Sequence, residues 1–400
     1  MRNPLRLAVV AAVLFTSAPA AAYEVADHTD VYAYFKQWYA LSEGMPEAKG
    51  NLQSPSRDEA VDEASGFRFA AVRAGIRTRT KDNRFGFEAQ LRLERDPQLL
   101  ECEGRVTFAP WLSLHAGQMK IPSVYENLMS DTGIDFMVRS QMASAAADYA
   151  LSRTTYASSL FYGNLSQLRD LGIAAKGEVK LGPVPLRYFG MVGNGLGANL
   201  YIGGNSGKEY VITNSPGDVY LGLRTEVDPW PGVLRLGGFA SHNRHDDMLF
   251  NSGRAVVDVH RHAWGSDLQV DLARSGMRAS GAYSRGTTLD DFDDNGKKDL
   301  MWSGWEWRVV WRLNPVLRLL APCRMLEAHA FEIGFRHDEL STESDESGVV
   351  VRRTANTVGV NYLYRSWMKV QMNYVQRRID DPFEPDLSGN AWLMSLQVKI

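Results

Sequence analysis

The feature that most constrains this chain is an alternation of apolar and polar side chains with a period of two residues. In the segment 84–94 every second residue is apolar, namely Phe85, Phe87, Ala89, Leu91 and Leu93. The same alternation returns at 304–312, at 368–374 and at 392–400. Successive side chains of a strand point to opposite faces, so each segment predicts a strand with one apolar and one polar face.

About seventeen such segments cover the chain, and their connections alternate in length. Short, turn-forming joints such as 81–83 and 228–232 alternate with long polar stretches. The long stretches are 42–66, 120–150, 195–215, 244–254, 286–300, 338–350 and 379–389. Short turns on one side and long loops on the other are typical of an outer-membrane barrel. We predict an all-β fold, a transmembrane antiparallel up-and-down β-barrel of about 16 strands (alternatively 18), with long extracellular loops and short periplasmic turns.

Composition excludes other classes. Past residue 22 no stretch approaches the ~20 apolar residues of a membrane-spanning helix. The formal net charge of −3 leaves no basic excess for nucleic acid. A soluble β-sandwich also alternates, but its strands are usually shorter than these.

The N-terminus has the layout of a secretory signal peptide over residues 1–22. Arg2 and Arg6 form a positive region, 7–15 an apolar one, and Ala20–Ala22 a small-residue cleavage site. We therefore expect export, a single barrel over 23–400, and location in the outer membrane of a Gram-negative bacterium, in contact with its lipid.

Three short motifs carry a family resemblance. They are the GQMKIP segment 117–122, the DFMVRS segment 135–140 and the RDLGI segment 169–173. In this order they resemble the phosphate-selective porins of the O and P type. The resemblance implies a barrel of about sixteen strands, commonly a homotrimer, that passes anions through a constriction lined by Lys and Arg. It also implies that Lys120 and Arg139 lie on an inward-folded constriction loop at 120–150.

Arginines on the polar faces of two neighbouring strands extend this interpretation. Arg73, Arg77 and Arg92 fall on the lumen side of the segments 67–79 and 84–95. The planar guanidinium binds two oxygens of an oxyanion at once. We predict a porin for passive diffusion of small hydrophilic solutes, in particular anions such as phosphate. Glu88 and Glu94 share this face, so a balanced wall that only holds water stays open as an alternative.

Two other interpretations of the sequence also stay open. One is a structural or adhesion barrel whose lumen is plugged by the loop 120–150. The other is a rim hydrolase built on His242 and His245, but no G-x-S-x-G or H-E-x-x-H motif is present. We therefore expect that the protein is not an enzyme. Cys102 and Cys323 pair only if their Cα atoms approach within ~7 Å, which the sequence does not decide.

One loop carries oxygen ligands at calcium-binding spacing. Asp291, Asp293 and Asn295 precede Gly296, and Asp299 follows at the ninth position. Such oxygens wrap Ca²⁺ at about 2.3–2.6 Å. The bidentate glutamate at position twelve is missing, since Trp302 stands there. We expect no required cofactor, with an extracellular calcium site at this loop as an open hypothesis.

If the loop holds calcium, the double substitution Asp291→Asn and Asp293→Asn will weaken binding at least tenfold, because two charged ligands become neutral. Calcium titration by calorimetry measures this, with Asp82→Asn in the turn 81–83 as the control. Equal affinity in all three proteins would contradict the hypothesis.

Overall fold

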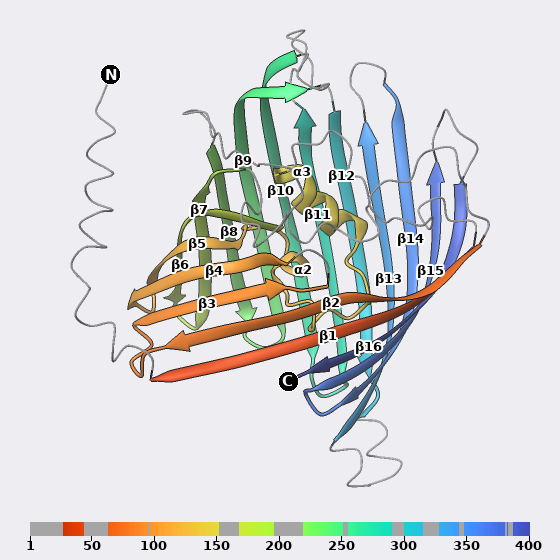
Figure 1. Ribbon diagram of the computed structural model, residues 1–400, viewed down its shortest axis with the longest axis horizontal. Helices are drawn as coiled ribbons and strands as arrows, with labels where there is room; N and C mark the ends of the chain where they lie inside the picture. The colour runs from red at the N-terminus through yellow and green to blue at the C-terminus, as the bar shows by residue number, and fades with distance from the viewer. Residues whose placement is uncertain are drawn as a thin grey trace.

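The chain folds into one closed antiparallel barrel. The computed structural model describes residues 27–43, 63–94, 97–151, 168–195, 219–250, 255–289, 300–314, 328–343, 348–380, 382 and 387–400. Each strand pairs with its sequence neighbours, and β1 closes the ring against β16. Figure 1 shows the strands surrounding two short helices. The predicted sixteen-stranded barrel is confirmed.

The strands follow the chain in order around the ring. They are β1 (His28–Glu43), β2 (Glu63–Arg79), β3 (Phe85–Arg92), β4 (Gln98–Ala109), β5 (Leu112–Lys120), β6 (Arg169–Leu181), β7 (Val184–Gly193), β8 (Val219–Trp230), β9 (Leu234–Phe250), β10 (Ala255–Leu272), β11 (Met277–Leu289), β12 (Leu300–Arg312), β13 (His329–Glu343), β14 (Val350–Tyr364), β15 (Met368–Asp380) and β16 (Leu387–Lys399). The helices are α2 (Tyr125–Leu128) and α3 (Gln141–Leu151).

The two faces of the wall differ as the alternation predicts. On β16 the outward residues Trp392 and Met394 are 44% and 45% exposed, whereas Ser395 and Gln397 point inward and are buried. On β12 the exposed Trp305 and Trp307 flank the buried, inward Glu306. An apolar outer belt on a closed barrel is the surface that meets lipid. The lumen is therefore lined by polar and charged side chains.

The last residues of the chain complete the ring. Phe35 lies opposite Val398 in the register of β1 and β16. The backbone N–H of Ile400 donates to the Ala33 carbonyl at 2.8 Å, and the Ala33 N–H donates back to Ile400 at 3.1 Å. No strand edge is left between β1 and β16 at this point. A closed ring removes the unpaired edges that a membrane would not tolerate.

The connections follow the predicted alternation, but the bounds of several of them differ. The connection from β12 to β13 spans residues 313–328, although it lies on the side of the short turns. In contrast, β9 extends to Phe250 and β10 starts at Ala255, so the predicted loop 244–254 is mostly strand. His245, which falls within that predicted loop, lies on β9 instead, as does His242.

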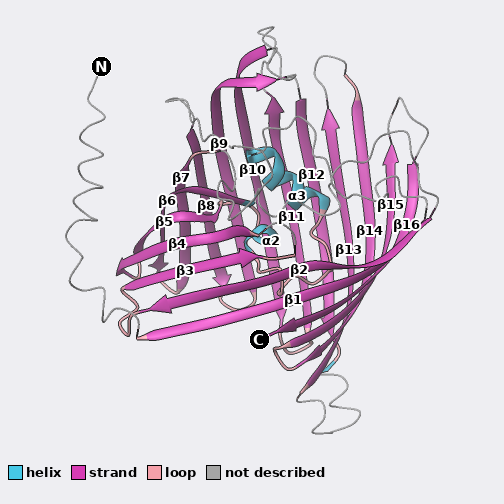
Figure 2. Ribbon diagram, in the orientation of Figure 1, coloured by secondary structure: helices cyan, strands magenta, loops and turns pink. Residues whose placement is uncertain are grey.

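The wall is of uneven height, as Figure 2 shows. The strands β3 and β5 have 8 and 9 residues, while β9 and β10 have 17 and 18. The chain leaves the low wall at the end of β5. It then enters the lumen with α2 and α3 before it returns to β6.

Several predicted features lie outside the described residues. They are the signal peptide 1–22, the calcium-loop residues Asp291, Asp293, Asn295 and Asp299, and Cys323. The hypotheses attached to them stay predictions. None of the described helices is long and apolar enough to cross a membrane.

Gly117, in the GQMKIP segment, holds a backbone conformation that other residues avoid. Its φ is +130°, and a Cβ at this position would collide with the carbonyl oxygen of Cys102 on β4. We expect Gly117→Ala to lower the free energy of unfolding by about 1–3 kcal/mol, through strain at the β4–β5 pair. Thermal unfolding in detergent measures the loss.

The matched control for this substitution is Gly104→Ala, also in the β4–β5 pair. A Cβ at Gly104 meets no atom within 4 Å. Equal unfolding temperatures for the two variants would contradict the strain argument.

Candidate functional site

The candidate site is the segment after β5 that folds into the lumen, residues 121–151, called the lumen loop below. Three apolar clusters fix it to the wall. Ile121 packs with Met119, Ala174, Met191 and Tyr220. Met137 and Val138 pack with Trp38, Val375, Ala391 and Leu393.

The third cluster seats α3. Val124 and the buried face of α3 pack against Phe239, Ala263, Trp302 and Leu340. These wall residues point into the lumen, where a wet pore would need polar groups. The helix covers them, and it contacts β9 to β13. The lumen loop therefore covers an apolar patch on the inside of the barrel and keeps it away from water.

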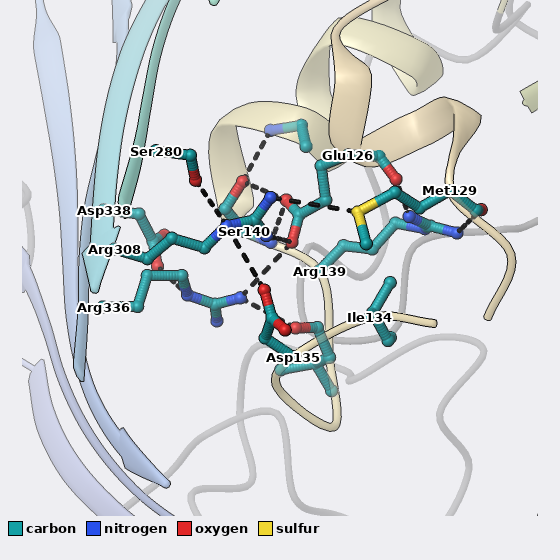
Figure 3. Close-up of polar contacts among 12 residues, drawn as sticks. Glu126, Met129, Ile134, Asp135, Arg139, Ser140, Ser280, Arg308, Arg336 and Asp338 are labelled. Carbon is teal, nitrogen blue, oxygen red and sulfur yellow. Dashed lines mark hydrogen bonds and ion pairs between the residues drawn. The ribbon is translucent and has the colours of Figure 1, made fainter. Parts of the chain in front are cut away.

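Glu126 on α2 is the first charged anchor, drawn in Figure 3. One carboxylate oxygen accepts from the Arg308 guanidinium at 2.8 Å and lies 3.8 Å from Arg336. The other accepts from the Ser140 hydroxyl at 2.8 Å and from its backbone N–H at 3.1 Å. Burial alone would raise the pKa of Glu126, but Arg308 and Arg336 more than offset this and lower it. The carboxylate is therefore held charged in the lumen.

Arg336 and the start of α3 continue this network. Arg336 lies 3.2 Å from Asp338 on the same strand and donates to the Val138 carbonyl at 2.8 Å. The backbone N–H of Gln141 donates to Asp338 at 3.0 Å. The wall thus binds both the carboxylate of α2 and the first turn of α3.

Asp131 is the second anchor, on the opposite side of the loop. It pairs with Arg73 of β2 at 2.6 Å and with Arg139 of the loop at 2.8 Å. Burial alone would raise the pKa of Asp131, but the two guanidiniums hold it well below its usual range. Arg139 also donates to the carbonyls of Glu126 and Met129. Arg139 therefore binds the loop to itself as well as to Asp131.

The predicted pore residue Lys120 lies at the end of β5. Its ammonium donates to the carbonyls of Leu128 and Met129, at 3.1 and 2.9 Å. The lysine thus closes the turn that follows α2. Both of these hydrogen bonds are directed at backbone carbonyls of the lumen loop.

The predicted arginine wall carries a carboxylate beside each guanidinium. Arg73 lies opposite Arg92 across β2 and β3. Arg73 pairs with Asp131, Arg77 with Glu88 at 2.6 Å, and Arg92 with Glu94 at 3.7 Å. Of these three, Arg77 has the most exposed side chain, at 54%. It is the member of the predicted set that solvent in the lumen reaches most freely.

The far tip of the lumen loop reaches the opposite wall. Asp135 pairs with Arg278 of β11 at 2.8 Å, and the Lys369 ammonium donates to the Ile134 carbonyl at 2.5 Å. Nearer β5, Arg224 pairs with Asp267 at 2.7 Å, and Asp267 accepts from the Tyr125 N–H at 3.1 Å. The loop therefore contacts distant parts of the ring, β8 and β10 near Tyr125 and β15 near Ile134.

A cavity of about 310 Å³ lies between the loop and the turns of β8–β9 and β10–β11. Tyr125, Asp135, Arg235, Arg278 and Arg308 are among its lining residues. It places guanidiniums on the turn side of the constriction. Among the described residues no group of three His, Cys, Asp or Glu side chains is arranged to hold a metal ion.

Sequence reasoning missed Glu126, Asp131 and Arg336. Arg308 lies on the polar face that the alternation of 304–312 predicts, but its partner is 182 positions away. One rule could have pointed to these residues from the sequence: charged side chains that face into a lumen need partners of opposite charge.

Comparisons with known proteins agree on the fold. No protein family and no curated protein matches the sequence. The anion-selective porin from Comamonas acidovorans shares 9% identity with a TM-score of 0.59, over 93% of this chain and 99% of that one. The outer membrane channel DcaP of Acinetobacter baumannii shares 10% identity with a TM-score of 0.55, over 93% and 97%.

A third solved structure, OmpF of Salmonella typhi in complex with daunomycin, shares 8% identity with a TM-score of 0.55, over 93% and 97%. The fold is that of outer-membrane porins. At these identities the likeness concerns the fold alone, and the activity has to be argued from the lumen.

The two carboxylate anchors, Glu126 and Asp131, predict that acid weakens the attachment of the lumen loop to the wall. The pKa of both carboxyls is depressed in the folded chain, so their contribution is complete above the ordinary pKa of about 4 and is lost as the pH falls further. We expect Glu126→Gln to cost about 3–5 kcal/mol at pH 7, because it leaves buried guanidiniums unpaired. Chemical unfolding in detergent at pH 7 and pH 3 measures both effects.

The control is Glu178→Gln on β6, which lies 3.9 Å from Arg187, while Arg187 keeps its closer partners Asp228 at 2.7 Å and Glu226 at 3.2 Å. This long, partly exposed contact is worth well under about 1 kcal/mol. A Glu126→Gln variant that is as stable as this control at pH 7 would contradict the anchoring role.

Proposed function

We propose that this protein is a channel of the outer membrane for passive diffusion of small hydrophilic solutes, with a preference for anions such as phosphate. The observation that carries the proposal is a closed barrel with a charged lumen that an inward loop narrows. A wet lumen lets solutes pass, and the charges fixed at its narrowest part select among ions.

The charge balance inside the barrel supports anion preference. Among the described residues ten Lys or Arg side chains are buried, against seven Asp or Glu. In a barrel whose outer face is apolar, these groups line the lumen or the lumen loop. The excess of buried cations along the lumen favours anions electrostatically.

Phosphate as the solute is supported by the sequence motifs and by one structural neighbour. The GQMKIP segment and the later motifs resemble phosphate-selective porins, and one structural neighbour is named an anion-selective porin. Lys120 and Arg139 would charge the constriction, while Arg77 and the arginines of the cavity would present guanidiniums to a passing oxyanion.

A plugged structural or adhesion barrel is the second candidate. The observation that favours it is the depth of anchoring: the lumen loop reaches walls on opposite sides, and residues 121–124 and 136–146 are buried. In such a barrel the ion pairs would hold a plug in place. A measurement of current separates the two candidates.

Three further expectations stay proposals. A homotrimer is supported by large outward apolar side chains on β1 and β2, with Val31 76% and Phe67 75% exposed. Native mass spectrometry would test it. The absence of enzymatic activity and the calcium site at 291–299 remain predictions from the sequence.

Charge removal in the lumen tests the channel and its selectivity together. In a planar bilayer under a KCl gradient, we expect the refolded protein to show steady current steps. The reversal potential should lie toward the equilibrium potential of chloride, as in an anion-selective channel. Arg77→Gln and Lys120→Gln should each shift the reversal potential toward zero, because each removes one lumen cation. Added phosphate should reduce the wild-type current.

The matched control is Arg378→Gln, whose side chain is 59% exposed on β15. It should leave the reversal potential unchanged. Cation selectivity in the wild type would overturn the anion claim but keep the channel. A folded barrel without current would overturn the channel and favour the plug.

A further inference from the structure

Three histidines gather on the outer face of the barrel, outside the proposed pore. His262 on β10 lies directly opposite His242 on β9. Their chain neighbours Arg261, Ala263 and Asn243 are buried toward the lumen, so the histidines point outward. His260 lies two positions before His262, and a two-residue step along a strand returns to the same face.

The pair His242 and His262 is in direct contact through its nitrogens. The two Nδ1 atoms lie 3.1 Å apart, and the ring centroids are separated by 4.6 Å. The centroid of His260 lies 5.9 Å from that of His242. The register of β9 against β10 fixes all three backbone positions.

We propose that this cluster is a binding site for a late transition-metal ion such as Zn²⁺, with His242 and His262 as ligands and His260 as the third. Two nitrogens bound to tetrahedral zinc at about 2.0–2.1 Å lie roughly 3.3–3.4 Å apart. The Nδ1 separation is therefore within a few tenths of an ångström of that of two zinc ligands. Neutral imidazole is a preferred ligand of zinc, nickel and copper.

The third ligand requires a side-chain movement only. As the side chains stand, three ligands do not converge on one point in the described part of the chain. The side chains of His260 and His262 both point to the outside of the barrel. A rotation about the side-chain bonds of His260 brings its ring toward His242 and His262. Such rotamer changes leave the strands in place.

The position along the barrel keeps the site accessible to ions. Trp264, two residues beyond His262 on the same face, is 52% exposed. Outward tryptophans mark the membrane interface in barrels. The next outward positions toward the long loops, His262 and His260, therefore lie where water reaches the surface, and the remaining coordination positions of the metal stay open.

Zinc and copper binding to the untagged, refolded full-length barrel tests the site. We expect one Zn²⁺ per chain by calorimetry at pH 7.5, and Cu²⁺ electron paramagnetic resonance with nitrogen coupling from imidazole. His242→Gln and His262→Gln should each weaken Zn²⁺ binding at least tenfold. His260→Gln should weaken it less and remove one imidazole from the copper spectrum.

The matched control is His337→Gln, which removes another outward histidine, on β13, whose ring bonds Asn356 at 2.7 Å. It should bind zinc like the wild type. The proposal is overturned if the wild type binds zinc no more tightly than the His242→Gln/His262→Gln double variant. It is also overturned if His337→Gln loses binding equally, or if copper shows no imidazole coupling.

Discussion

The position of the lumen loop depends on the burial of two loop carboxylates among arginines of the wall. Glu126 meets Arg308 and Arg336, and Asp131 meets Arg73. Charges taken out of water are tolerated only when they are paired. If the loop left the lumen, these wall guanidiniums would lose their carboxylate partners on the loop, so wall and loop hold each other in place. In the proposed channel, the same ion pairs that stabilise the loop would also set the charge of the opening.

The alternation of side chains along each strand lets the same wall face lipid on the outside and a polar lumen on the inside. Its outer face presents Trp305 and Trp307 to lipid, while the alternate residues Glu306 and Arg308 line the lumen. The exception is the inner apolar patch under α3, which includes Phe239 and the other wall residues of that cluster. A helix of small residues fills that patch, so the lumen is narrowed by apolar packing against β9 to β13 and by ion pairs of the loop with β2, β12 and β13.

The fold was predictable from the sequence because strand geometry has a fixed period of two. The alternation of Phe85 to Leu93 placed every side chain of that segment on its correct face. The contacts of the loop were not predictable in this way. Whether Glu126 meets Arg308 depends on the register accumulated over the strands between them and on the path of the loop. Likewise, Arg73 was predictable as a lumen residue, but its partner Asp131 lies on that loop.

The central claim is that the lumen loop sets the width of the pore. Polymer exclusion measures this width directly, through the size of polyethylene glycol that still reduces single-channel conductance. The account predicts that a variant with residues 123–150 replaced by a short Gly-Ser linker conducts more and admits larger polymers than the wild type. An unchanged conductance and an unchanged size limit in a folded variant would contradict it.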